Sequence, residues 1–140
     1  MSSLDRQLGV DLFNGTWTLI ESRADDELML HMAHASAYHW AIAPECKPEN
    51  RARSEWLASR VYAILGRAEP ARHHAERCLD WCERHGLGDW DLGFAYEALA
   101  RASRVAGDDA AADGYVARAR AVPIDEADDR ELLERDLASI

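Results

Sequence analysis

The sequence predicts an all-α protein of one domain, built from three antiparallel helical hairpins and a terminal helix. Alanine and arginine are frequent and β-branched residues are sparse, which favours helix. Turn signals at Asp25, Gly66 and Gly107 divide the chain into two intervals of equal length. With 140 residues, 48% of them hydrophobic, the chain is long enough and apolar enough for a packed core.

The same 41-residue interval also relates residues away from the turns, which indicates an internal repeat. Small residues at such places let the two helices of a hairpin approach closely. The positions that match are Leu30, Ala71 and Ala112; His34, Ala75 and Val116; Ala37, Cys78 and Ala119; Trp17, Ala58 and Leu99; and Thr18, Ser59 and Ala100.

Capping and breaking residues set the expected helix ends. Asp25 is an N-cap, Pro44 ends the second helix, and Gly66 closes the third. Gly9 and Gly15 weaken the first helix, and we expect a break there. The expected helices are 4–22, 25–43, 49–65, 69–85, 89–106, 108–122 and 125–139, which form hairpins over about 4–43, 49–85 and 89–122 and a capping helix over about 125–139.

The capping helix is acidic and carries one apolar stripe of Leu132, Leu133 and Leu137. We expect this stripe to cover the last hairpin, because the end of a repeat array needs a polar outer surface. The helix either folds back over the groove of the array or serves another copy of the chain.

The segments GRAEPARHHAERCLDW, from Gly66, and GDDAAADGYVARARAVP, from Gly107, resemble the tetratricopeptide-repeat family. The resemblance covers about residues 51–123 and extends weakly to 10–43. It implies a short right-handed solenoid whose first helices line a concave groove that binds a protein or peptide. The usual Leu-Gly pair is absent from the first helices, and the 41-residue period is longer than the usual one of about 34.

Four arginines fall on the first helices of the hairpins and are candidates to line this groove. Guanidinium groups suit carboxylates and phosphates, so the groove is expected to take an acidic segment of a partner. The alternative is that the arginines form ordinary ion pairs with Glu55, Glu97 and other local acids. The candidate groove residues are Arg53, Trp56, Arg60, Phe94, Arg101 and Arg104.

A stripe on the second helix is a candidate metal or small-molecule site, and hence an alternative function that includes an enzyme. Glu27, His31, His34 and Tyr38 lie three or four residues apart, on one helix face. A carboxylate and two imidazoles suit a divalent metal such as zinc. The alternative is that the histidines simply find hydrogen-bond partners in a helix that is packed on most sides.

A second stripe, on the fourth helix, also combines potential zinc ligands: His74, Cys78, Cys82 and His85. A straight helix spreads these side chains over about 16 Å, whereas zinc ligands converge within about 2.3 Å of the ion. We therefore expect Cys78 and Cys82 to be small core residues.

The remaining features narrow the function classes. A net charge of −10 argues against nucleic-acid and membrane partners. No phosphate loop or nucleophile motif is present, so no residue is predicted to be catalytic and no cofactor is expected. The N-terminus lacks the features of a signal peptide, and three cysteines suggest free thiols in the cytoplasm. Homo-oligomerisation is a further possibility, through the first helix with Leu8, Leu12 and Phe13.

Overall fold

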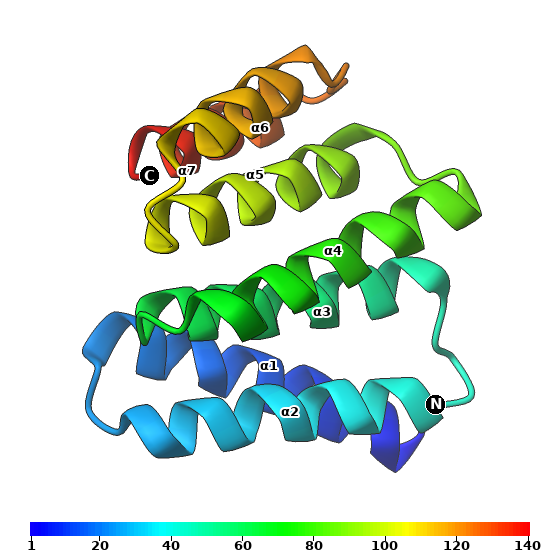
Figure 1. The fold of residues 1–140 in the computed structure, drawn as a ribbon. Helices are drawn as coiled ribbons and strands as arrows, with labels where there is room; N and C mark the ends of the chain where they lie inside the picture. The colour runs from blue at the N-terminus through cyan, green and yellow to red at the C-terminus, as the bar shows by residue number, and fades with distance from the viewer.

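The computed structural model describes residues 1–140 and contains seven helices and no strand, which confirms the all-α fold class (Figure 1). The helices begin and end within two residues of the expected positions. They are α1 (Leu4–Ser22), α2 (Asp26–Ile42), α3 (Pro48–Ile64), α4 (Ala68–His85), α5 (Asp89–Val105), α6 (Asp109–Ala121) and α7 (Ala127–Ala138).

Neighbouring helices pack in sequence order, as in a short helical solenoid (Figure 1). The hairpins are α1–α2, α3–α4 and α5–α6; α2 also contacts α3, α4 contacts α5, and α7 packs against α5. In Figure 1 the helices α2, α4 and α6 lie towards the viewer, and α1 and α3 lie behind them. None of the seven helices combines the length and apolarity that a membrane span requires.

The second and third hairpins repeat at the predicted interval, the one that separates Gly66 from Gly107. Each buried position of α3 from Ala52 to Val61 has a buried counterpart one such interval later in α5. The matching pairs are Ala52 and Gly93, Ser54 and Ala95, Leu57 and Ala98, Ala58 and Leu99, Ser59 and Ala100, and Val61 and Ala102.

The first hairpin is out of step with this interval. The residues in the left-handed conformation that follow α1, α3 and α5 are Arg23, Gly66 and Gly107. The turn between Arg23 and α2 holds one more residue, Ala24, than the turns that lead into α4 and α6. The inward residues of α2 are accordingly Met29, Ala33 and Ser36, not Leu30, His34 and Ala37. They match Ala71, Ala75 and Cys78 of α4 at a spacing one residue longer than the predicted interval. Likewise, Thr16 rather than Trp17 or Thr18 is the buried residue near the end of α1.

The expected break in the first helix is wrong, because α1 runs without interruption through both glycines. The absence of a side chain is used for packing instead. A Cβ atom on Gly9 would lie 2.8 Å from the indole of Trp40, and one on Gly15 would lie 2.4 Å from the Met32 methyl group. Ser36 also donates a hydrogen bond of 2.7 Å to the carbonyl of Gly9. Glycine therefore allows α2 to pack closely on α1.

Replacing Gly9 with alanine is expected to destabilise the protein by about 1–3 kcal/mol, because the added methyl group overpacks the contact with Trp40. The matched control is Gly114→Ala in α6, where a Cβ atom meets nothing within 4 Å. That substitution is expected to stabilise by about 0.5–1 kcal/mol. Urea unfolding measures both, and two stabilising substitutions would contradict the close α1–α2 contact.

Candidate functional site

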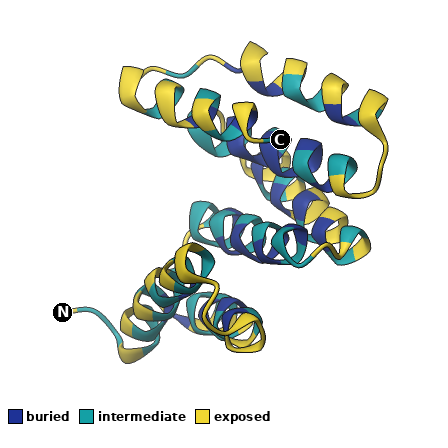
Figure 2. Cartoon of the chain, turned by 90° about the vertical axis from the view of Figure 1, so that its left-hand side faces the viewer, coloured by how far each residue is buried: buried dark blue, intermediate teal, exposed yellow.

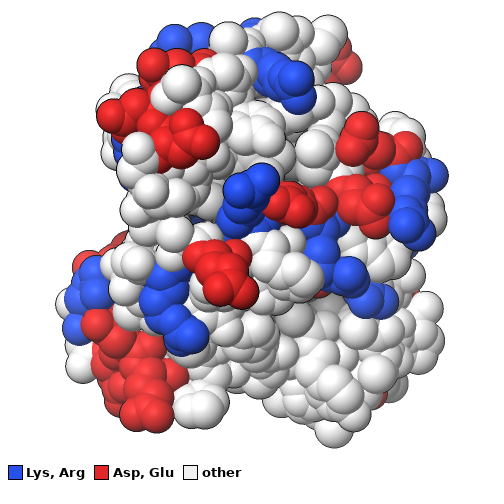
Figure 3. All heavy atoms as spheres, in the orientation of Figure 1, with Lys and Arg blue, Asp and Glu red and all other residues white.

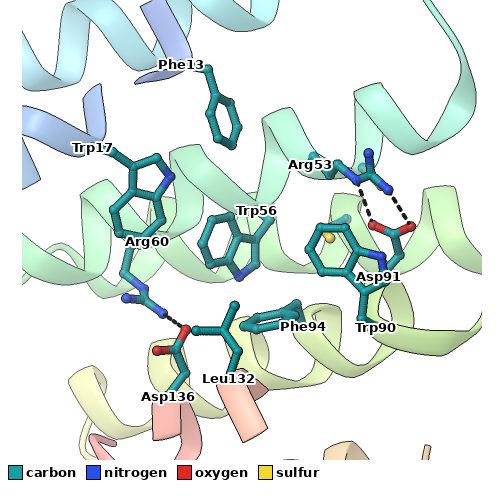
Figure 4. Close-up of a pocket in the computed structure, with 12 residues that line it drawn as sticks. Phe13, Trp17, Arg53, Trp56, Arg60, Trp90, Asp91, Phe94, Leu132 and Asp136 are labelled. Carbon is teal, nitrogen blue, oxygen red and sulfur yellow. Dashed lines mark hydrogen bonds and ion pairs between the residues drawn. The ribbon is translucent and has the colours of Figure 1, made fainter. Parts of the chain in front are cut away.

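A hollow of about 440 Å³ lies on the side of the solenoid formed by the first helices (Figure 4). We call it the inner pocket. Its walls come from α1, α3, α5 and α7, with one residue from α4, and Figure 2 shows how the N-terminal hairpin and the C-terminal helices stand apart on this side. The residues that line it are Phe13, Trp17, Ala52, Arg53, Trp56, Arg60, Cys78, Trp90, Asp91, Phe94, Leu132 and Asp136.

Five aromatic rings make the inner pocket predominantly apolar. Trp56, from the middle helix α3, lies at the centre of the set (Figure 4). Its ring centroid is 5.5 Å from that of Trp17 and 5.7 Å from that of Phe94, and the Phe94 contact is edge to face. Trp90 extends the row, at 5.8 Å from Phe94. Aromatic rings in such arrangements stabilise one another and hold their positions.

Arg53 lies at one end of the row of rings (Figure 4). Its guanidinium group donates two hydrogen bonds, of 2.9 and 3.1 Å, to the carboxylate of Asp91 in α5. It also lies 4.7 Å from the ring centroid of Trp90, a cation–π distance. Two contacts with α5 residues thus fix the orientation of this arginine.

Arg60 lies at the opposite end, within a network of charged groups. Its Nη2 atom donates to Glu97 Oε1 at 2.7 Å and to Asp136 Oδ2 at 3.1 Å. Glu97 is fully buried and also accepts a hydrogen bond of 3.0 Å from Arg101. Trp56 donates to the second Glu97 oxygen at 3.4 Å. The buried carboxylate therefore ties α3 to α5, and Asp136 adds α7.

Two buried polar side-chain atoms have no hydrogen-bond partner, and each belongs to a residue that lines a cavity on this side. One is Nε of Arg60, in the inner pocket. The other is Oγ of Ser54, in a smaller cavity of about 140 Å³ that shares Phe13 and Arg53 with the inner pocket. Both atoms are shielded from solvent by the surrounding protein atoms, so neither faces the open space of its cavity.

Of the six residues predicted to line a groove, the structure brings four together in the inner pocket: Arg53, Trp56, Arg60 and Phe94. Arg101 lies beside the network and donates to the Asp136 carbonyl and to Ser139 Oγ in α7's C-terminal turn. Arg104 lies outside the inner pocket, where it forms ion pairs with Asp109 and Asp113 of α6. All four arginines form ion pairs, but the alternative of ordinary solvated pairs describes only those of Arg104. Arg60 and Arg101 pair with the fully buried Glu97, and Glu55 pairs with His74 and Arg77 instead.

Sequence reasoning identified four of the 12 residues that line the pocket and missed the other eight. The residues for which the sequence predicted no pocket role are Phe13, Trp17, Ala52, Cys78, Trp90, Asp91, Leu132 and Asp136. The spacing of Phe13 and Trp17, four residues apart on a first helix, was a usable signal. No spacing pattern links Asp136 to Arg60 across 76 residues, so only the packed fold reveals that pair.

The candidate metal stripe on α2 lies on the outside of the molecule. Glu27 and His31 are largely exposed, with 4.0 Å between their nearest charged atoms. His34 is bonded instead to the hydroxyl of Tyr62 at 2.8 Å, and burial, together with nearby His74, lowers its pKa. No group of three or more His, Cys, Asp or Glu side chains is placed to hold a metal ion. The expectation that α2 is packed on most sides is wrong, since only three of its residues are buried.

The four residues of the α4 stripe serve packing and hydrogen bonding. Cys78 and Cys82 are buried, as expected, in a cluster with Ala52 and Ala95. A hydrogen bond with Cys82 and burial raise the pKa of the Cys78 thiol well above its usual value, which disfavours a reactive thiolate in the pocket wall. His74 bonds to Glu55 at 2.7 Å, and His85 stacks on Trp81.

Comparison with models of known protein families, with curated proteins and with solved structures finds no match. The arrangement of side chains is therefore the basis for the functional interpretation.

Proposed function

We propose that this chain is a helical-repeat scaffold that binds a segment of a protein partner in its inner pocket. The observation that carries the proposal is the pocket itself. Its walls come from every hairpin and from α7, and its volume of about 440 Å³ accommodates one large side chain with part of its backbone. Helical solenoids commonly use such concave surfaces for binding.

The lining of the pocket indicates the chemistry of the segment. An apolar or aromatic side chain would pack against Trp17, Trp56 and Phe94, where rigid rings supply contact area at low cost in conformational entropy. A carboxylate or carbonyl oxygen next to that side chain would accept from the Arg60 guanidinium group, where Asp136 accepts in the free protein. The preferred segment is therefore an apolar residue flanked by an acidic one.

Helix α7 occupies the edge of the pocket and supports this preference. Asp136 places a carboxylate beside Arg60, and Leu132 places an aliphatic side chain beside the rings (Figure 4). An acidic and an apolar residue of α7 thus already make the contacts that we expect of the partner. A bound segment would extend these contacts or take the place of one of them.

The proposal predicts that Leu132→Ala weakens binding at least about fivefold, or about 1 kcal/mol, while stability changes little. Leu132 lines the pocket but is 42% exposed, so its truncation leaves no buried cavity. The probe is a peptide selected by phage display on the wild-type protein, and calorimetry measures its affinity. Val105→Ala is the control, because Val105 is 36% exposed and lies outside the pocket. Equal affinities for wild type and Leu132→Ala, or a selection without enrichment, would count against the proposal.

An apolar small molecule is a second candidate ligand, because the volume and lining of the inner pocket also fall within the range of small-ligand sites. Mass spectrometry of an organic extract of the purified protein distinguishes the two. A stoichiometric compound that is lost in Leu132→Arg favours this candidate.

We place the protein in the cytoplasm, on the support of three cysteines that form no disulfide.

A further inference from the structure

The outer face of α2 is an uncharged stripe on a charged molecule. No Asp, Glu, Lys or Arg occurs from Leu28 to Ile42, although 30% of all residues are charged. In Figure 3 charged atoms gather at the lower left, near the start of α2, and the lower right of the molecule, where α2 ends in Figure 1, is white. This face is turned away from the core, since Met29, Ala33 and Ser36 face inward.

Large apolar side chains on this face are exposed to solvent. Leu28 is 46% exposed, Tyr38 61% and Ile42 48%. With His31 and Ala35 they form a row at intervals of three, four, three and four residues, the spacing of a coiled-coil seam. We call these five residues the outer seam. The sequence suggested the first helix as the surface for homo-oligomerisation. Its residues Leu8, Leu12 and Phe13 are partly buried within the chain.

We propose that the outer seam is the interface of a homodimer, in which a second copy of α2 packs antiparallel across a two-fold axis at Ala35. The seam is self-complementary about that residue. In either direction from Ala35 a polar ring, His31 or Tyr38, comes first, and a large aliphatic side chain, Leu28 or Ile42, follows. An antiparallel copy therefore sets aliphatic against aliphatic and ring against ring, as an isologous interface requires.

The charge distribution favours a second copy on this face over the outer face of α4. Two chains of net charge −10 repel each other, and an uncharged contact face avoids adding close charge pairs to that repulsion. The exposed face of α4, in contrast, carries the ion pairs Arg72–Glu76 and Arg84–Asp80. The small side chain of Ala35 at the proposed axis also lets the two helices approach closely.

The length of the seam sets the expected strength of the dimer. Fourteen residue steps span about 21 Å along α2, which covers less surface than a standard protein interface. We therefore expect a dissociation constant on the order of 10 µM, so that dimer and monomer coexist near that concentration and the dimer predominates well above it. The inner pocket lies among α1, α3, α5 and α7, so dimerisation through α2 leaves it open, and the two proposals can fail separately.

Sedimentation velocity from about 1 to about 500 µM tests the dimer. Wild type is expected to shift from 15.7 kDa towards twice that mass. Ala35→Glu places two carboxylates together at the axis and is expected to weaken association at least tenfold. Ala117→Glu, which adds the same charge on the exposed face of α6, is expected to behave as wild type. A wild type that stays monomeric at about 500 µM, or an equally strong Ala35→Glu dimer, overturns the proposal.

Disulfide trapping tests the antiparallel arrangement in a Cys46→Ser background, which leaves only the buried Cys78 and Cys82. Mild oxidation is expected to cross-link Ala35→Cys, because residue 35 meets its own copy at the axis. Leu28→Cys is expected to stay monomeric, because it faces Ile42 of the partner subunit. Cross-linking of Leu28→Cys without Ala35→Cys contradicts the two-fold axis proposed.

Discussion

Replacing Trp56 with alanine is expected to lower the free energy of unfolding by about 3–4 kcal/mol. Trp56 packs against four of the five apolar clusters of the molecule, among them the clusters that contain Leu57 and Leu133. Its indole also donates to Glu97. The truncation removes these contacts at once and widens the inner pocket, because no neighbouring side chain can take the place of the indole.

Trp81→Ala is the matched control for Trp56→Ala. Trp81 packs against one cluster only and carries its remaining contacts, with His85 and Arg51, at the surface. We expect a loss of about 1–2 kcal/mol. Urea unfolding, followed by circular dichroism, gives both values. If the two losses are equal, Trp56 does not have the central place in the packing that we assign to it.

Glu97→Ala is expected to cost about 3 kcal/mol, because it leaves Arg60 and Arg101 without their shared buried carboxylate. The value lies at the lower end of the range for breaking a buried ion pair, since Asp136 remains within 3.1 Å of Arg60. Glu97→Gln keeps the acceptor oxygen and is expected to cost less. Urea unfolding at neutral pH measures the free energy of unfolding of both variants.

The control for Glu97→Ala is Glu76→Ala, which breaks the exposed pair with Arg72. Exposed pairs contribute little, so a change below about 0.5 kcal/mol is expected. A loss for Glu97→Ala as small as that control would show that the charged network does not join α3 to α5 in solution.

The sequence predicted the helices well because the signals involved are local. Asp25 accepts from the backbone N–H of Leu28, and Gly66 and Gly107 adopt the left-handed conformation that ends a helix. The register of the first hairpin was missed for a local reason too. Asp25 was aligned with Gly66 as a turn marker, whereas Arg23 is the residue that takes the equivalent left-handed conformation.

The site was predicted only in part because its decisive contacts join distant segments. The internal repeat placed Arg53, Arg60, Trp56 and Phe94 on first helices, and they do meet in one pocket. The repeat carried no information on α7, which has no counterpart in the hairpins. Helix propensity likewise could not reveal that Gly9 serves close packing rather than a break, because the reason lies in Trp40.

Indole resonances test the proposed binding site most directly, because the five tryptophans fall inside and outside it. Trp17, Trp56 and Trp90 line the inner pocket, whereas Trp81 lies outside it. Titration of ¹⁵N-labelled protein with the selected peptide is expected to shift the Nε1–H signals of the three pocket residues and to leave Trp81 in place. A titration that moves Trp81 alone, or none of the pocket indoles, contradicts the assignment of the inner pocket as the binding site.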